Sequence, residues 1–122
     1  MKSTLEVFIQ DRVIFSSREH WLYPLFELEE FLKNNRYTPA ELSVRDKVVG
    51  RGAAFLLIRL GIRSLQAGVL SRAAREVLDR AGIEFSWRSL VEKISCRTEA
   101  DLIRIDDPEE AYQLLRESLN PR

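Results

Sequence analysis

The chain has 122 residues, of which 45% are hydrophobic and 31% charged, a balance typical of one globular domain covering residues 1–122. Its 19 basic and 19 acidic residues cancel, so net charge predicts neither a nucleic-acid partner nor a membrane-surface partner. The single cysteine, Cys96, excludes an internal disulfide and a cysteine-rich metal site, and it favours a cytoplasmic location.

Two short β-rich runs near the start of the chain predict a hairpin. Leu5–Ile9 and Val13–Phe15 flank the polar residues 10–12. A helix is expected to begin at Pro24, which suits a first helical turn, and to continue with helical spacing of apolar residues to about Asn34. The capping-box pattern of residues 38–41 then predicts one short turn of helix.

The middle of the chain predicts a buried helix. Asp46 is expected to cap its start, the helix to continue to about Leu60, and Gly61 to end it. Apolar residues surround its axis, which is typical of a helix buried on all sides. Beyond it, strands are predicted over Ile62–Ala67 and Ile83–Trp87. Between these strands lies a second helix, which Ser71 caps and Gly82 ends.

The C-terminal part predicts one more strand and one more helix. The strand is expected over Leu90–Cys96, and the helix opens with acidic residues from Asp106, where negative charge suits the helix dipole. Strands that alternate with helices imply a sheet covered by helices. We therefore predict an α/β fold, a three-layer α/β/α sandwich around a mixed sheet. In the last helix the residues expected to face inward are Ala111, Leu114, Leu115 and Leu119.

The order of elements, with a hairpin first and a buried helix in the middle, resembles the cytidine-deaminase-like superfamily. Within it, the sequence is similar to an uncharacterised bacterial and archaeal family of similar length. The segments that carry this similarity are Pro24–Leu32, Asp46–Ala54 and Asp106–Ala111. The resemblance implies a deaminase-like fold over nearly the whole chain.

The zinc ligands of deaminases have no counterpart in this sequence. In deaminases a His-x-Glu or Cys-x-Glu opens the central helix, Pro-Cys-x-x-Cys opens the next, and the glutamate shuttles protons. The matching segments here are Val49–Ala53 and Leu70–Ala74, and neither contains histidine or cysteine. His20 and Cys96 lie elsewhere, and two ligands do not make the three that a catalytic zinc requires. The sequence therefore predicts no metal, no cofactor and no zinc-dependent deamination.

Basic residues at the two expected helix starts predict an anion site instead. Lys47 and Arg51 are spaced four residues apart at the first helix start, and Arg72 and Arg75 occupy the same place at the second. Free helix amides attract anions, and glycines let a ligand approach the backbone closely. The alternative is ordinary surface charge, with the glycines serving tight packing. The candidate ligand-binding residues are Asp46, Lys47, Gly50, Arg51, Gly52, Ser71 and Arg72.

Three functions stay open at this point. The leading hypothesis is a non-catalytic or regulatory domain that binds a small anionic or nucleotide-like ligand. The first alternative is a metal-independent enzyme that uses Asp46, Lys47 or Cys96, although a helix cap, a solvated lysine and a buried thiol are the plainer interpretations. The second alternative is a structural subunit of a homo-oligomer. His20 lies in an aromatic run and could contact a ligand, but such runs more often pack as connectors.

Overall fold

The computed structural model describes residues 3–94 and 105–119. Its elements follow the order ββαβαβαβα, with one additional short 3₁₀ helix labelled η1. The bounds are β1 Leu5–Ile9, β2 Arg12–Ser17, α1 Tyr23–Lys33, η1 Pro39–Glu41, β3 Leu42–Val49, α2 Arg51–Leu60, β4 Ser64–Ser71, α3 Arg72–Arg80, β5 Glu84–Val91 and α5 Pro108–Leu119.

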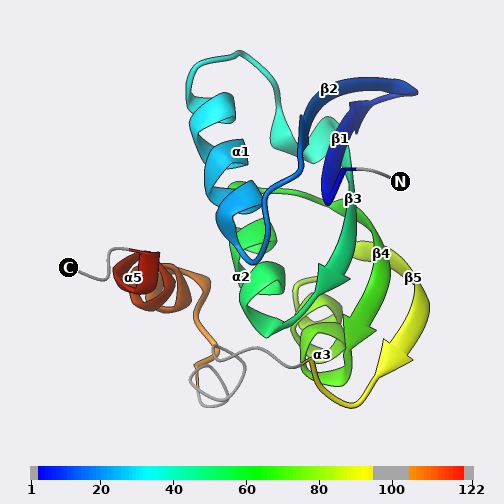
Figure 1. Ribbon diagram of the computed structural model, residues 1–122, viewed down its shortest axis with the longest axis vertical. Coiled ribbons are helices and arrows are strands. Elements are labelled where there is room, and N and C mark those ends of the chain that lie inside the picture. The colour runs from blue at the N-terminus through cyan, green and yellow to red at the C-terminus, as the bar shows by residue number, and fades with distance from the viewer. Residues whose placement is uncertain (1–2, 95–104, 120–122) are drawn as a thin grey trace.

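The five strands form one mixed sheet in the order β2-β1-β3-β4-β5. Strand β1 is antiparallel to both of its neighbours, whereas β3, β4 and β5 are parallel. From β2 onward the chain therefore crosses the sheet in one direction through strands that all point the same way. Because such crossovers are right-handed, their connecting helices lie on one face of the sheet. Figure 1 shows α1, α2 and α3 together on that side.

Burial along the strands agrees with a sheet that is covered on one face. Val7, Val44 and Leu65 are buried, while Arg45 and Gln66 on the opposite face are exposed. The predicted α/β class and mixed sheet are confirmed. The predicted second helical layer on the other face is not found among residues 3–94 and 105–119. The remaining helix, α5, packs against α2 on the side away from the sheet (Figure 1), so the layers follow the order sheet, α1–α3, α5.

Several local expectations are confirmed by the structure. The N-terminal hairpin forms, and Pro24 lies in the first turn of α1. Ser71 caps α3, because its Oγ accepts a hydrogen bond from the Ala74 amide at 3.1 Å. Gly61 ends α2 in the left-handed region, with a φ of 88° that favours glycine. These features depend on short-range chemistry, which a sequence pattern records directly.

The expectation that Asp46 caps the central helix is wrong. Asp46 lies inside β3, where it pairs with Leu5 of β1 and Ala67 of β4. Helix α2 begins only at Arg51, and its N-cap is Gly50, which supplies no side-chain hydrogen bond. The valines before Arg51 belong to the strand, because Val48 and Val49 pair with Val69 and Leu70 of β4. The expectation that Lys47 and Arg51 lie one turn apart on the same helix is therefore wrong as well, because Lys47 belongs to β3.

Other strand boundaries also differ from the sequence prediction. The strand expected over Ile62–Ala67 is β4, which begins at Ser64 and continues to Ser71. The two strands expected after Gly82 form a single strand, β5, up to Val91. The expected strand end at Cys96 lies outside the described residues. In α5, Ala111 and Leu115 are buried and Leu114 is partly buried, while the side chain of Leu119 is not among those described.

The central helix is buried as predicted. Every residue from Arg51 to Leu57 is buried, because α2 is enclosed by the sheet, α1, α3 and α5. Beneath it, β3 and β4 approach each other closely at Gly68. A Cβ at that position would lie 2.5 Å from the carbonyl oxygen of Lys47, so only glycine fits without a backbone shift. Gly68 thus allows the two strands that lead into α2 and α3 to pair closely.

Candidate functional site

The starts of α2 and α3 lie side by side at one edge of the sheet. Val49 and Leu70 are paired across the parallel strands β3 and β4, and each is followed at once by a helix N-cap, Gly50 or Ser71. Ser71 is fully buried, and its hydroxyl is already used by the Ala74 amide. The two helix starts therefore lie close together, but the Ser71 cap is packed into the protein.

Arg51 holds the segment that leads into α5. The residue is only 6% exposed, although it carries a charge. Its Nη2 donates to the carbonyl oxygen of Ile105 at 2.6 Å and to Oδ1 of Asp106 at 3.1 Å. Its guanidinium also lies over the ring of Phe55, 5.1 Å from the centroid. A buried charge requires such partners, so Arg51 fixes residues 105–106 against α2.

Arg72 has a different carboxylate partner. Its Nε lies 2.9 Å from Oε2 of Glu92, and both side chains are exposed. The structure therefore does not bring Arg51 and Arg72 together on one acceptor. Lys47 is exposed on β3, and Gly52 is buried inside α2. The carbonyl of Gly50 accepts the first hydrogen bond of the helix, from the Ala54 amide at 3.0 Å.

Asp46 is a partly buried carboxyl group inside the sheet. Burial raises its pKa to about 7, although hydrogen bonds from the backbone amides of Val48 and Lys47 favour the charged form. A carboxyl group with such a pKa changes charge near neutrality. The raised pKa follows from the position of Asp46 in a strand. The sequence pattern placed Asp46 at a helix cap and therefore did not predict it.

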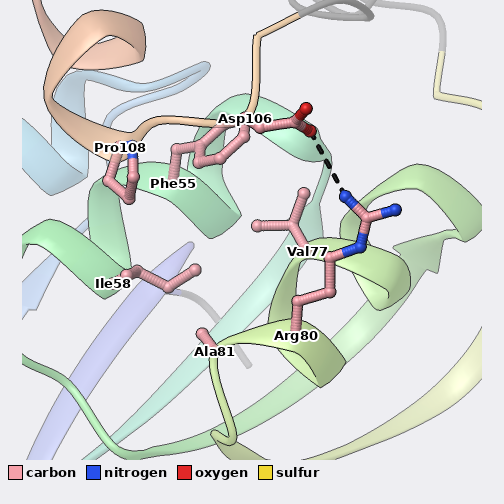
Figure 2. A pocket seen from close by; sticks show the side chains of 7 residues that line it. All are labelled: Phe55, Ile58, Val77, Arg80, Ala81, Asp106 and Pro108. Atoms are coloured by element: carbon pink, nitrogen blue, oxygen red, sulfur yellow. Dashed lines mark hydrogen bonds and ion pairs between the residues drawn. The ribbon is translucent and has the colours of Figure 1, made fainter.

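A hollow of about 240 Å³ opens between α2, α3 and the segment before α5. Figure 2 shows its lining, with Arg80 and Asp106 facing each other at the rim. The Nη1 of Arg80 lies 3.4 Å from the same Asp106 oxygen that binds Arg51. The other lining residues are apolar, and they are Phe55, Ile58, Val77, Ala81 and Pro108. The hollow thus combines an apolar floor with a guanidinium at its edge.

A second polar cluster joins α1, α2 and α5. Glu29 is buried, and its carboxylate accepts from Arg59 Nη1 at 2.6 Å and from the Tyr112 hydroxyl at 3.1 Å. Arg59 also pairs with Glu109 at 2.8 Å and lies over the Tyr112 ring at 3.4 Å from its centroid. Arg116 approaches Glu29 to 3.8 Å. The cluster therefore ties the three helices together by charge.

The ionisation of Glu29 follows from these contacts. Burial by itself raises its pKa, but hydrogen bonds from Arg59 and Tyr112 outweigh burial and hold the pKa below 4.5. Burial and the hydrogen bond to Glu29 raise the pKa of Tyr112. The sequence reasoning did not identify this cluster. A usable signal was present, because Glu29 lies four residues after Leu25 on the apolar side of a predicted helix.

The described residues contain no group of three histidine, cysteine, aspartate or glutamate side chains placed to hold a metal ion. His20 is exposed, just before α1. Cys96 lies outside the residues that the structure describes, so its predicted roles stay predictions. The absence of bound zinc in the purified protein also stays a prediction. In the described part of the chain, no helix has the length and apolar character needed to cross a membrane.

Fold and site together define a small α/β domain with a mixed five-stranded sheet and arginine–carboxylate clusters between its helices. The chain belongs to the TM1506 family, described as a domain of unknown function (DUF1893), which matches residues 2–119. It is similar to the crystal structure of a DUF1893 family protein (TM1506) from Thermotoga maritima, with a TM-score of 0.85 and 25% sequence identity. That match covers 95% of this chain and 80% of the other. No curated protein matches the chain.

Proposed function

We propose that this protein is a non-catalytic domain that binds a small anion carrying an apolar ring or short chain. The observation that supports the proposal is the apolar hollow with Arg80 at its rim. Small-molecule sites are typically apolar clefts with a few polar groups that fix the orientation of the ligand. The guanidinium of Arg80 supplies such a group for a carboxylate or phosphate.

The size of the hollow narrows the class of ligand. Its volume of about 240 Å³ lies below the roughly 300–1,000 Å³ of pockets for drug-sized ligands. A single-ring or short-chain acid suits this volume better than a whole nucleotide. The sequence predicted an anionic or nucleotide-like ligand at the helix starts. We retain the anion but place it between the facing C-terminal halves of α2 and α3.

The rim is accessible to a dissolved anion. The side chain of Arg80 is 64% exposed, and its two carboxylate partners, Glu76 at 2.9 Å and Asp106 at 3.4 Å, are 61% and 72% exposed. Exposed ion pairs contribute only about 0–1 kcal/mol, so an added carboxylate or phosphate can compete for the guanidinium. The deaminase-like resemblance and the cytoplasmic location stay predictions, and the binding proposal depends on neither.

Isothermal calorimetry with phenyl phosphate, benzoate and inorganic phosphate tests the proposal. We expect the two ring-bearing acids to bind more tightly than inorganic phosphate, because their rings cover the apolar residues of the hollow and remove them from water. Arg80→Gln should weaken their binding about tenfold, the effect of losing a charged hydrogen bond of roughly 1.5 kcal/mol. Ala81→Leu should also weaken it, because the added carbons occupy the hollow.

Arg75→Gln is the matched control on the same helix. The Arg75 guanidinium lies over the Trp87 ring, 5.2 Å from the centroid, and is not among the residues that line the hollow. Its replacement should leave the affinity unchanged. Equal losses in the Arg80 and Arg75 variants would show general charge attraction instead of a site. Absence of binding by both ring-bearing acids at millimolar concentration would reject the proposed ligand class.

A further inference from the structure

One carboxylate oxygen connects two helices to the segment that precedes α5. Oδ1 of Asp106 lies 3.1 Å from Arg51 Nη2 and 3.4 Å from Arg80 Nη1. Arg51 projects from α2 and Arg80 from α3. The same Arg51 nitrogen also donates to the carbonyl of Ile105 at 2.6 Å. Asp106 therefore occupies the position where an anion would meet both guanidinium groups.

We propose that Asp106 is an internal competitor for the anionic group of the ligand, so that binding in the hollow weakens the docking of α5. This inference rests on the proposed ligand site. Asp106 itself lines the hollow (Figure 2) and is largely exposed, so a ligand anion approaches the same side of Arg80. Two negative groups at one position repel each other, and an anion bound to Arg80 therefore displaces the Asp106 carboxylate.

The displaced contact lies directly beside the start of α5. Asp107 caps the helix by accepting from the Glu110 amide at 3.1 Å, and the helix begins at Pro108. Other contacts retain α5, including the Arg59 pair with Glu109 and the buried Ala111. Loss of the Asp106 contacts therefore does not detach the helix. It lowers the free energy of local opening, which hydrogen exchange measures.

Hydrogen exchange of the full chain, followed by mass spectrometry, measures this coupling with phenyl phosphate as the probe. We expect the amides of α5 to exchange about two to five times faster at saturating phenyl phosphate, the factor that corresponds to loss of the exposed Arg80–Asp106 pair at up to about 1 kcal/mol. The exchange rates of the β4 amides should change no more than ligand binding changes exchange across the whole protein.

Substitutions separate Asp106 from its neighbour. Asp106→Ala should speed α5 exchange without phenyl phosphate at least as much, because it also removes the contact with the buried Arg51. It should bind phenyl phosphate about two to five times more tightly, because the competing carboxylate is gone. Asp107→Asn is the matched control. It removes the same charge one residue away and keeps a side chain that caps helices well. Neither the exchange rate of the α5 amides nor the affinity for phenyl phosphate should change in this control.

The outcomes distinguish the coupling from the ligand site. If phenyl phosphate binds while the exchange of α5 stays the same or slows, the coupling is overturned and the proposed site stands. If phenyl phosphate binds to no variant, the proposed function fails and the competition fails with it. If the Asp106 and Asp107 variants behave alike in both measurements, the role of Asp106 is overturned.

Discussion

Glu29 offers the most direct test of how the helices are held together. Its buried carboxylate accepts hydrogen bonds from Arg59 and Tyr112, which come from α2 and α5. Glu29→Gln keeps the shape and an acceptor for Tyr112, but it removes the charge that pairs with Arg59. Breaking a buried ion pair costs about 3–5 kcal/mol, and one charged hydrogen bond contributes about 1.5–3 kcal/mol. Because Arg59 is 25% exposed and keeps Glu109, we expect a loss of about 2 kcal/mol.

The pH dependence of this loss is a second part of the same test. Since the contacts of Glu29 hold its pKa below the ordinary 4.5, its carboxylate stabilises the fold above that pH. The contribution is lost as the pH falls through the lowered native pKa. Urea unfolding at about pH 7 and about pH 3 should therefore show a gap between wild type and Glu29→Gln that narrows in acid, where a protonated glutamate resembles glutamine.

Glu30→Gln provides the control on the same helix, because Glu30 is exposed. Its effect should stay within the roughly 0.5 kcal/mol typical of surface substitutions. A Glu29→Gln loss no larger than that of the control would show that the Glu29–Arg59 pair does not stabilise the fold. A gap of equal size at both pH values would contradict the ionic explanation.

Four further predictions concern the core, the sheet and the metal. Leu57→Ala should lower the free energy of unfolding in urea by about 2–5 kcal/mol, because Leu57 is fully buried; a loss below about 1 kcal/mol would contradict a central α2. Gly68→Ala should cost about 1–3 kcal/mol, because its Cβ would meet the Lys47 carbonyl oxygen; an unchanged melting temperature would contradict that contact. Asp46 has a native pKa raised from 3.8 to about 7, so the folded state binds more protons and stability should fall as the pH rises through this range; Asp46→Asn should remove that decline in thermal melts. Metal analysis of the purified protein should find no stoichiometric zinc, and about one zinc per chain that stabilises the fold would contradict the prediction.

Helix caps, helix ends and the burial of the central helix could be predicted from the sequence, because they depend on neighbouring residues. Ser71 caps α3 because a serine hydroxyl accepts from an amide three residues later, wherever that turn lies in the fold. Gly61 ends α2 because only glycine adopts a positive φ without strain. The apolar residues around the axis of α2 likewise required a buried helix. The absence of histidine and cysteine at the two helix starts was also visible in the sequence.

The contacts between charged residues depend on the fold and could not be predicted from the sequence. Asp46 belongs to a strand because β1 and β4 pair with its backbone on both sides, and residues 21 or more positions away supply those partners. The contact of Arg51 with Asp106 spans 55 residues, and that of Glu29 with Tyr112 spans 83. Local spacing carries no information about such distant pairs. The right-handed crossovers decided the layers, because they place α1, α2 and α3 on one face and allow α5 to cover α2.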